Sequence, residues 1–191
     1  MPSGEDNVDI LINSFLLVAA GEMGDKTQLL TFVLASRFRK PWAIILGILV
    51  ATLLNHFMAA SLGSWISAAI PPFYLKWILG LIFFIFAAWI LVPDKDTGLK
   101  EHGHWGAFFT TTIAFFLAEM GDKTQLATVA LAAKYESIII VTMGTTLGML
   151  FSNGLVVFLG EKITKKVPMK WVRIASAFLF LVFGVAIIIG Y

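Results

Sequence analysis

Two identical segments, Glu-Met-Gly-Asp-Lys-Thr-Gln-Leu, carry the residues of this chain best suited to chemistry, and they occupy residues 22–29 and 119–126. Each places two carboxylates and one ammonium group in the middle of a long apolar stretch. At the centre of a bilayer a charge costs about 2.5–3.5 kcal/mol, so four carboxylates cost on the order of 10 kcal/mol. Because packing alone does not repay that cost, we predict that a cation binds the four carboxylates, which are those of Glu22, Asp25, Glu119 and Asp122.

The other residues of the two segments suit a hard metal ion. The sequence has no cysteine, so a thiolate site is excluded, and carboxylate, hydroxyl and amide oxygens favour Mg²⁺, Ca²⁺ or Mn²⁺ over Zn²⁺ or copper. Gly24 and Gly121 either let opposing helices approach closely or let a helix unwind, so that backbone carbonyls join the site. The supporting ligands that we predict are Thr27, Gln28, Thr124 and Gln125.

The spacing of the charges predicts how they interact. Glu22 and Asp25 are three residues apart, so on a helix their carboxylates share one face, and Glu119 and Asp122 repeat that spacing. In each segment the lysine, Lys26 or Lys123, follows the glutamate by four residues, which is the favourable order for an ion pair within one helix.

The charge balance of these groups favours an exchange process. Four carboxylates and two ammonium groups give the empty site a net charge of −2, which one divalent cation or two protons would neutralise. A neutral core crosses a membrane at lower cost than a charged one. Alternate occupancy by a divalent cation or by protons therefore predicts coupled exchange.

The elements that position these residues are predicted to be membrane-spanning helices. The chain is 59% hydrophobic and 14% charged, with a mean hydropathy of +0.88, which is typical of a polytopic all-α membrane protein. The net charge of +2 gives no indication of nucleic-acid binding. Six spans are predicted, with the charged segments in the first and fourth: 8–36, 42–70, 74–92, 105–133, 137–160 and 169–190.

The repeat predicts two homologous halves, residues 1–93 and 105–191, joined by a polar cytoplasmic connector at 94–104. Gly47 and Gly144 have the same separation as the two segments. Each half contains three spans, and an odd number of crossings inverts the second half relative to the first, a plan typical of secondary transporters.

Basic residues predict the orientation of the spans. Ten of the 14 lysines and arginines lie in or next to the connectors after spans one, three and five, so those connectors are predicted to be cytoplasmic and both termini external. The segment before the first span contains no basic residue, so we expect that span to be retained rather than cleaved as a signal peptide. A bacterial inner-membrane protein fits these features best.

A second group of polar residues lies near the middle of spans two and five. Asn55, His56, Ser152 and Asn153 either complete the ion's surroundings and a proton path, or hydrogen-bond neighbouring spans together. His56 corresponds to Asn153 and so breaks the repeat. His102 and His104 in the connector bind metal loosely at most, and a solvated loop is the simpler interpretation.

The doubled motif Glu-x-Gly-Asp-Lys/Arg-Thr/Ser resembles the signature of a cation/proton exchanger family, which includes Golgi manganese/calcium transporters, chloroplast manganese transporters and bacterial manganese exporters. The resemblance covers nearly the whole chain. It implies an inverted-repeat transporter that moves Mn²⁺ or Ca²⁺ out of the cytosol against protons, with the chain's short length favouring the bacterial exporters. The family motif falls on Glu22, Gly24, Asp25, Lys26 and Thr27, and on Glu119, Gly121, Asp122, Lys123 and Thr124.

Other functions remain open at this point. An acidic ring also suits a passive divalent-cation channel. The Met-Gly-Asp sequence within a span is similar to the Gly-x-Gly-Asp of intramembrane aspartyl proteases, although the partner Tyr-Asp motif is missing, and an exporter of cationic amino acids is a third alternative. We therefore expect a transporter rather than an enzyme, with no prosthetic group, and with the divalent cation, protons and lipid as its partners. No sequence feature points to an oligomer.

Overall fold

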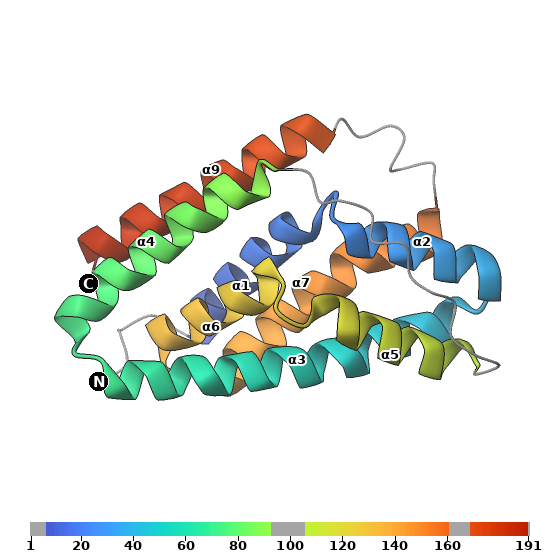
Figure 1. Cartoon of the computed structure of the whole chain (residues 1–191), viewed down its shortest axis with the longest axis horizontal. Coiled ribbons are helices and arrows are strands. Elements are labelled where there is room, and N and C mark those ends of the chain that lie inside the picture. Colours follow the sequence, from blue (N-terminus) through green and yellow to red (C-terminus); the bar gives the residue numbers. More distant parts are fainter. Residues whose placement is uncertain (1–6, 93–105, 161–168, 191) are drawn as a thin grey trace.

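The computed structural model describes residues 7–92, 106–160 and 169–190, and every regular element within these ranges is a helix. The predicted connector at 94–104, with His102 and His104, lies outside the described residues. The helices are α1 (Asn7–Glu22), α2 (Lys26–Phe38), α3 (Pro41–Ala69), α4 (Pro72–Ile90), α5 (Ala107–Glu119), α6 (Lys123–Tyr135), α7 (Ile138–Leu159) and α9 (Met169–Gly190) (Figure 1).

The first and fourth predicted spans are each broken into two helices at the charged motif. α1 ends at Glu22 and α2 begins at Lys26, while α5 ends at Glu119 and α6 begins at Lys123. The prediction of one continuous helix through each motif is therefore wrong, and the alternative in which the glycines let the helix unwind is the correct one. The physical reason is the backbone of Gly24 and Gly121, described below.

The other predicted spans agree with single helices to within a few residues. Pro41 and Pro72 each occupy the first position of a helix, where the missing N–H of proline costs no hydrogen bond. Four helices, namely α3, α4, α7 and residues 170–190 of α9, are long and apolar enough to cross a membrane, and α5 is a shorter apolar helix. The chain is a multi-pass membrane protein.

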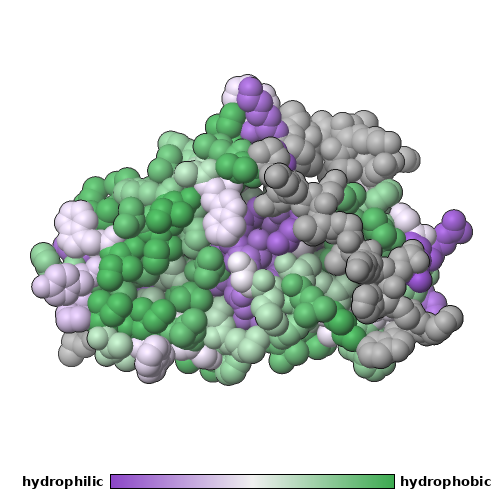
Figure 2. All heavy atoms as spheres, viewed as in Figure 1, coloured by the Kyte–Doolittle hydropathy of each residue, from purple (hydrophilic) through white to green (hydrophobic). Residues whose placement is uncertain are grey.

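Helices from opposite halves of the sequence pack against one another. α1 lies along α7, and α3 lies along α5, while α4 pairs with α9 at one side of the molecule (Figure 1). Both broken spans run through the middle of this arrangement. Figure 2 shows hydrophilic atoms in the centre of a largely hydrophobic face, at the level where Figure 1 shows the two helix breaks. The helices of one half thus pack between those of the other, and the charged motifs lie in the middle of the molecule.

Equivalent positions of the two halves share unusual backbone geometry. Arg39 and Glu136, which end α2 and α6, have left-handed φ values of 50° and 52°. Gly47 and Gly144 make equivalent close contacts: a Cβ at Gly47 would lie 2.8 Å from the Cβ of Thr111, and one at Gly144 would lie 2.8 Å from the Cβ of Ser14. These pairs keep the spacing of the repeated motif, so the similarity of the halves extends well beyond it.

Candidate cation site at the broken helices

Each break is a tight turn that only glycine accepts without strain. Gly24 and Gly121 have φ values of 81° and 77°, in the left-handed region that side chains with a Cβ disfavour. A Cβ at Gly121 would meet no atom of the described part of the chain within 4 Å, so the conformation of the turn, rather than close packing, requires this glycine.

The turn changes the direction in which the acidic side chains point. Glu22 is the last residue of α1, whereas Asp25 is the N-cap of α2 and accepts a hydrogen bond from its own neighbour, Lys26 N, at 2.7 Å. Asp122 occupies the same N-cap position of α6. The prediction that the glutamate and aspartate share one helix face is wrong, because the two residues belong to different helices.

The glutamine of each motif hydrogen-bonds to the backbone of its own turn. The Gly24 N–H donates to Gln28 Oε1 at 2.9 Å, and the Gly121 N–H donates to Gln125 Oε1 at 2.6 Å. These amides satisfy backbone groups that the break removes from the helix ladder. Gln28 and Gln125 therefore position the turn, and their predicted part as ligands stays a prediction.

The threonines orient the glutamates in the same symmetric way. Thr27 Oγ1 donates to Glu22 Oε2 at 2.8 Å, and Thr124 Oγ1 donates to Glu119 Oε2 at 3.3 Å. Each bond holds one carboxylate oxygen and leaves the other for a different partner. Ligation by Thr27 and Thr124 likewise stays a prediction.

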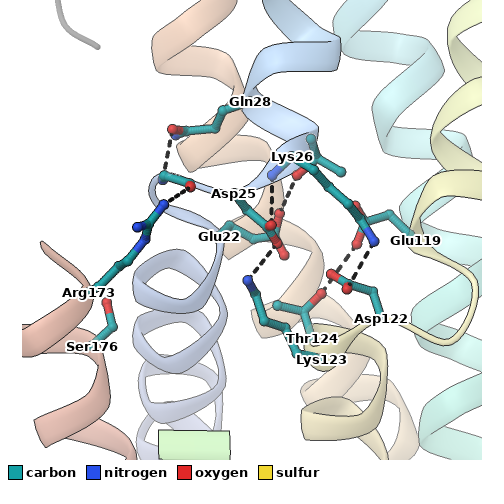
Figure 3. A network of polar contacts seen from close by, with 12 residues as sticks. Glu22, Asp25, Lys26, Gln28, Glu119, Asp122, Lys123, Thr124, Arg173 and Ser176 are labelled. Carbon is teal, nitrogen blue, oxygen red and sulfur yellow. Dashed lines mark hydrogen bonds and ion pairs between the residues drawn. The ribbon is translucent and has the colours of Figure 1, made fainter. Parts of the chain in front are cut away.

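Carboxylates from both motifs converge on one buried place. One oxygen from each of Glu22, Asp25 and Asp122 lies within 4.8 Å of the others, and all three residues are buried. Glu119, the fourth predicted carboxylate, is buried as well but lies outside this group of three in the described part of the chain. Figure 3 shows Glu119 beside Asp122 at the edge of the network.

Several buried carboxylate oxygens of the two motifs have capacity for a cation. Oε1 of Glu22, Oε1 of Glu119 and Oδ2 of Asp122 are buried and receive no hydrogen bond from the described residues. Unpaired buried acceptors are costly, because they have lost their water without gaining a donor. A divalent cation with oxygen ligands would satisfy them.

The lysines pair across the two halves. Lys26 Nζ lies 3.1 Å from Asp122 Oδ1, and Lys123 Nζ lies 3.0 Å from Asp25 Oδ2 (Figure 3). The expectation that each lysine pairs with the glutamate of its own helix is therefore wrong, because the break separates Glu22 from the helix that carries Lys26. The cross-pairing joins the two motifs into one electrostatic unit.

The polar residues of α3 and α7 hold the motifs of the opposite half. Gln28 Nε2 donates to the Ser152 carbonyl at 3.1 Å, and Gln125 Nε2 donates to the Asn55 carbonyl at 3.5 Å. In return, Ser152 Oγ donates to the Ala19 carbonyl at 2.9 Å and Asn55 Nδ2 to the Phe116 carbonyl at 3.0 Å. Asn55 and Ser152 thus support the broken helices, which fits the helix-joining alternative.

His56 and Asn153 differ in their environment although they occupy equivalent positions. Asn153 Oδ1 accepts a hydrogen bond from Thr31 Oγ1 at 2.7 Å. His56 is fully buried, and neither of its ring nitrogens has a hydrogen-bond partner among the described residues. The geometry explains Asn153 as a structural link and leaves His56 as a candidate for the proton path.

Sequence reasoning missed Arg173, which it counted only among the basic residues that set the orientation. Arg173 Nη2 donates to the Gly24 carbonyl at 3.4 Å, and Ser176 Oγ on the same helix donates to the Ala20 carbonyl at 2.7 Å (Figure 3). These bonds satisfy carbonyls at the open end of α1. The sequence did contain a signal for Arg173: another basic residue, Lys76, occupies the equivalent position of the first half.

The model of the family described as divalent cation/proton antiporter GDT1 matches residues 10–98 and 107–191. The chain belongs to this antiporter family. It is a membrane transporter of divalent cations and protons, and not an enzyme, so the protease alternative is excluded. The GDT1 model matches each half of the chain separately, which supports an ancestral duplication.

Relatives of the GDT1 family cover almost the whole chain. A Vibrio cholerae protein named "Putative manganese exporter" is 46% identical over 183 residues, which is 95% of this chain and 92% of the relative. A GDT1-like protein of Synechocystis is 26% identical, with 89% of this chain and 92% of the relative covered. GDT1-like protein 3 of Arabidopsis thaliana is 24% identical, with 93% and 70% covered. No solved structure matches the chain.

Proposed function

We propose that this antiporter exports Mn²⁺ from the cytoplasm in exchange for protons, with Ca²⁺ as a second possible substrate. The observation that carries the proposal is the convergence of Glu22, Asp25 and Asp122, which two separate motifs bring within 4.8 Å of one another in the protein interior. Their oxygens suit hard divalent cations. The name of the Vibrio cholerae relative supports manganese over calcium.

The lysines define the proposed exchange. With both lysines charged, the four motif carboxylates leave a net charge of −2, and either one divalent cation or two protons restores neutrality. Glu119 completes the set as the fourth carboxylate, joining the other three when an ion binds. Because Lys26 and Lys123 form ion pairs with the aspartates, the two glutamates are the carboxylates best placed to exchange protons for metal.

The repeat is the basis of the membrane topology that we propose. We propose that each half crosses the membrane three times, with α1–α2 and α5–α6 each forming one broken span, and that the halves are inverted relative to each other. The basic residues Arg37, Arg39 and Lys40 favour a cytoplasmic position for the connector between α2 and α3, with both termini outside. A bacterial plasma membrane is the proposed location.

The proposal is tested with the purified protein in sealed liposomes that contain a divalent-metal dye and a pH dye. Mn²⁺, Ca²⁺ and Mg²⁺ are added separately, with and without an imposed proton gradient. Metal entry accompanied by opposite proton movement supports the exchanger and ranks its substrates. Metal entry that is indifferent to the proton gradient supports a passive channel, and no entry of any of the three ions contradicts a divalent-metal substrate.

A further inference from the structure

Both halves make the same close helix contacts at one pair of equivalent glycines. Gly47 on α3 packs against Thr111 on α5, and Gly144 on α7 packs against Ser14 on α1, with the same 2.8 Å separation for an added Cβ. Small residues at such positions let helix backbones approach closely. The core of the molecule is therefore built alike in its two halves.

A second pair of equivalent glycines breaks this likeness. A Cβ at Gly63, near the end of α3, would lie 3.0 Å from the Cβ of Ala132 on α6, and closer still to the Val129 carbonyl oxygen. A Cβ at Gly160, the equivalent position directly after α7, would meet none of the described residues within 4 Å. α3 thus packs closely against α6 at Gly63, and we call this the sealed contact. The end of α7 makes no equivalent contact with α2.

A groove occupies the place of the missing contact. It has a volume of ≈ 290 Å³, and α2 and the end of α7 line it. Its α2 residues are Phe32, Ala35 and Ser36, which correspond by the repeat to Val129, Ala132 and Ala133 of the sealed contact. In Figure 1 the groove-forming ends of α2 and α7 lie together at one end of the molecule, beside the start of α3.

Other residues show the same difference between the two ends. The side chain of Lys26, on α2, is 27% exposed, whereas that of Lys123, on α6, is 7% exposed. Tyr135 at the end of α6 is buried and accepts a hydrogen bond from Asn13 on α1 at 3.1 Å. Phe38, its equivalent on α2, is only half-buried. The site is therefore better covered on the α6 side than on the α2 side.

We propose that the α2–α7 groove and the α3–α6 contact are the two gates of the transport cycle, and that the structure is open at the α2–α7 gate. In the opposite state α2 closes on α7, with Gly160 in the role that Gly63 has here, while α6 leaves α3. In an inverted repeat the second state follows when the halves exchange conformations. This inference rests on the proposed function, and the basic residues at the end of α2 make the open gate the cytoplasmic one.

Bulk inside the open groove tests the proposal, because it prevents closure without touching the carboxylates. Ala35→Trp is expected to lower the rate of Mn²⁺/proton exchange about tenfold or more, while Mn²⁺ binding to the purified protein is unchanged. Val33→Trp is the matched control, because Val33 lies on the same helix and is 53% exposed on its outer face. Exchange by Ala35→Trp at the rate of the Val33→Trp control would overturn the proposal.

Single cysteines give a second readout that does not depend on the tryptophan variant folding. The chain has no native cysteine, so Ala35→Cys and Ala132→Cys, at equivalent positions of the two gates, can be labelled separately in liposomes with a membrane-impermeant thiol reagent. We expect rapid labelling of Ala35→Cys and protection of Ala132→Cys. Addition of Gly63→Leu, which wedges the sealed gate open, should reverse that pattern, and Leu62→Phe, at an exposed neighbour, should not.

The two failures are distinguishable. If the wild-type protein exchanges no metal for protons, the proposed function fails whatever the labelling shows. If wild-type exchange is present and Gly63→Leu leaves both labelling rates unchanged, the assignment of the gates fails and the proposed function stands.

Discussion

Lys123 Nζ lies 3.0 Å from Asp25 Oδ2, so an ammonium group from the second half of the chain neutralises a carboxylate of the first half. The pair Lys26–Asp122 does the reverse at 3.1 Å. Each motif alone would leave a buried aspartate without a cation. The site is therefore complete only when the two halves are assembled, which ties the fold and the transport site together.

Removal of the more buried lysine should destabilise the protein strongly. Lys123→Gln leaves Asp25 buried without its cation, and loss of one partner from a buried ion pair costs about 3–5 kcal/mol. Thermal unfolding in detergent measures the effect. The double variant Asp25→Asn/Lys123→Gln should recover most of the stability but no transport, and a double variant no more stable than Lys123→Gln would contradict the pairing.

Removal of charge from a glutamate should abolish exchange and preserve the fold. Glu22→Gln keeps the side chain's shape and an oxygen to accept the Thr27 hydrogen bond, but it removes one of the negative charges that the divalent cation neutralises. Mn²⁺ uptake into liposomes and size-exclusion profiles are the measurements. Asp9→Asn, which changes an exposed carboxylate at the start of α1, is the control, and substantial uptake by Glu22→Gln would remove Glu22 from the site.

The left-handed turn should not tolerate a Cβ. Gly121→Ala places an L side chain at φ 77°, which costs about 1–2 kcal/mol, although the added methyl meets no other atom. Gly190→Ala also adds a methyl in open space, but on a helix without a positive φ. Stability and Mn²⁺ uptake should fall only in Gly121→Ala, and equal behaviour of the two variants would show that the conformation of the turn is unimportant.

His56→Asn separates the two interpretations of that residue. The substitution gives position 56 the side chain of its counterpart Asn153, which accepts a hydrogen bond from Thr31 in the other half. We expect a folded protein whose exchange rate is reduced, because the imidazole on the proposed proton path is gone. Exchange is measured between about pH 6 and 8, where imidazole titrates in water, and a wild-type rate throughout would assign His56 to helix packing alone.

Hydropathy predicted the outer ends of the spans to within about two residues, and the start of α9 at Met169 directly, because lipid imposes a length on apolar segments. The eight-residue repeat pointed to the acidic residues that converge in the structure, because charge in an apolar span is costly and therefore conspicuous. Sequence spacing failed to predict the partner of Lys26, since it assumed one continuous helix where the turn at Gly24 separates α1 from α2. The partner of each lysine then depended on how two distant segments pack, and no local pattern contains that information.

The difference between Gly63 and Gly160 was also beyond the sequence. Both glycines stand at equivalent positions of the repeat, so the repeat alone predicts the same environment for each, although Gly63 lies within α3 and Gly160 follows the last residue of α7. If access to a central site alternates between two sides, the two glycines have different surroundings in any single conformation. In the proposed cycle, the asymmetry belongs to the state in which the protein is seen rather than to the repeated residues.

The central claim is that the site alternates between one divalent cation and two protons, and the coupling ratio tests it most directly. Proton and Mn²⁺ fluxes are measured together in liposomes, with the membrane potential first clamped at zero and then imposed. The charge balance of four carboxylates and two lysines predicts about two protons per Mn²⁺ and a rate that is insensitive to the potential. A ratio near one, with transport driven by the potential, would contradict it.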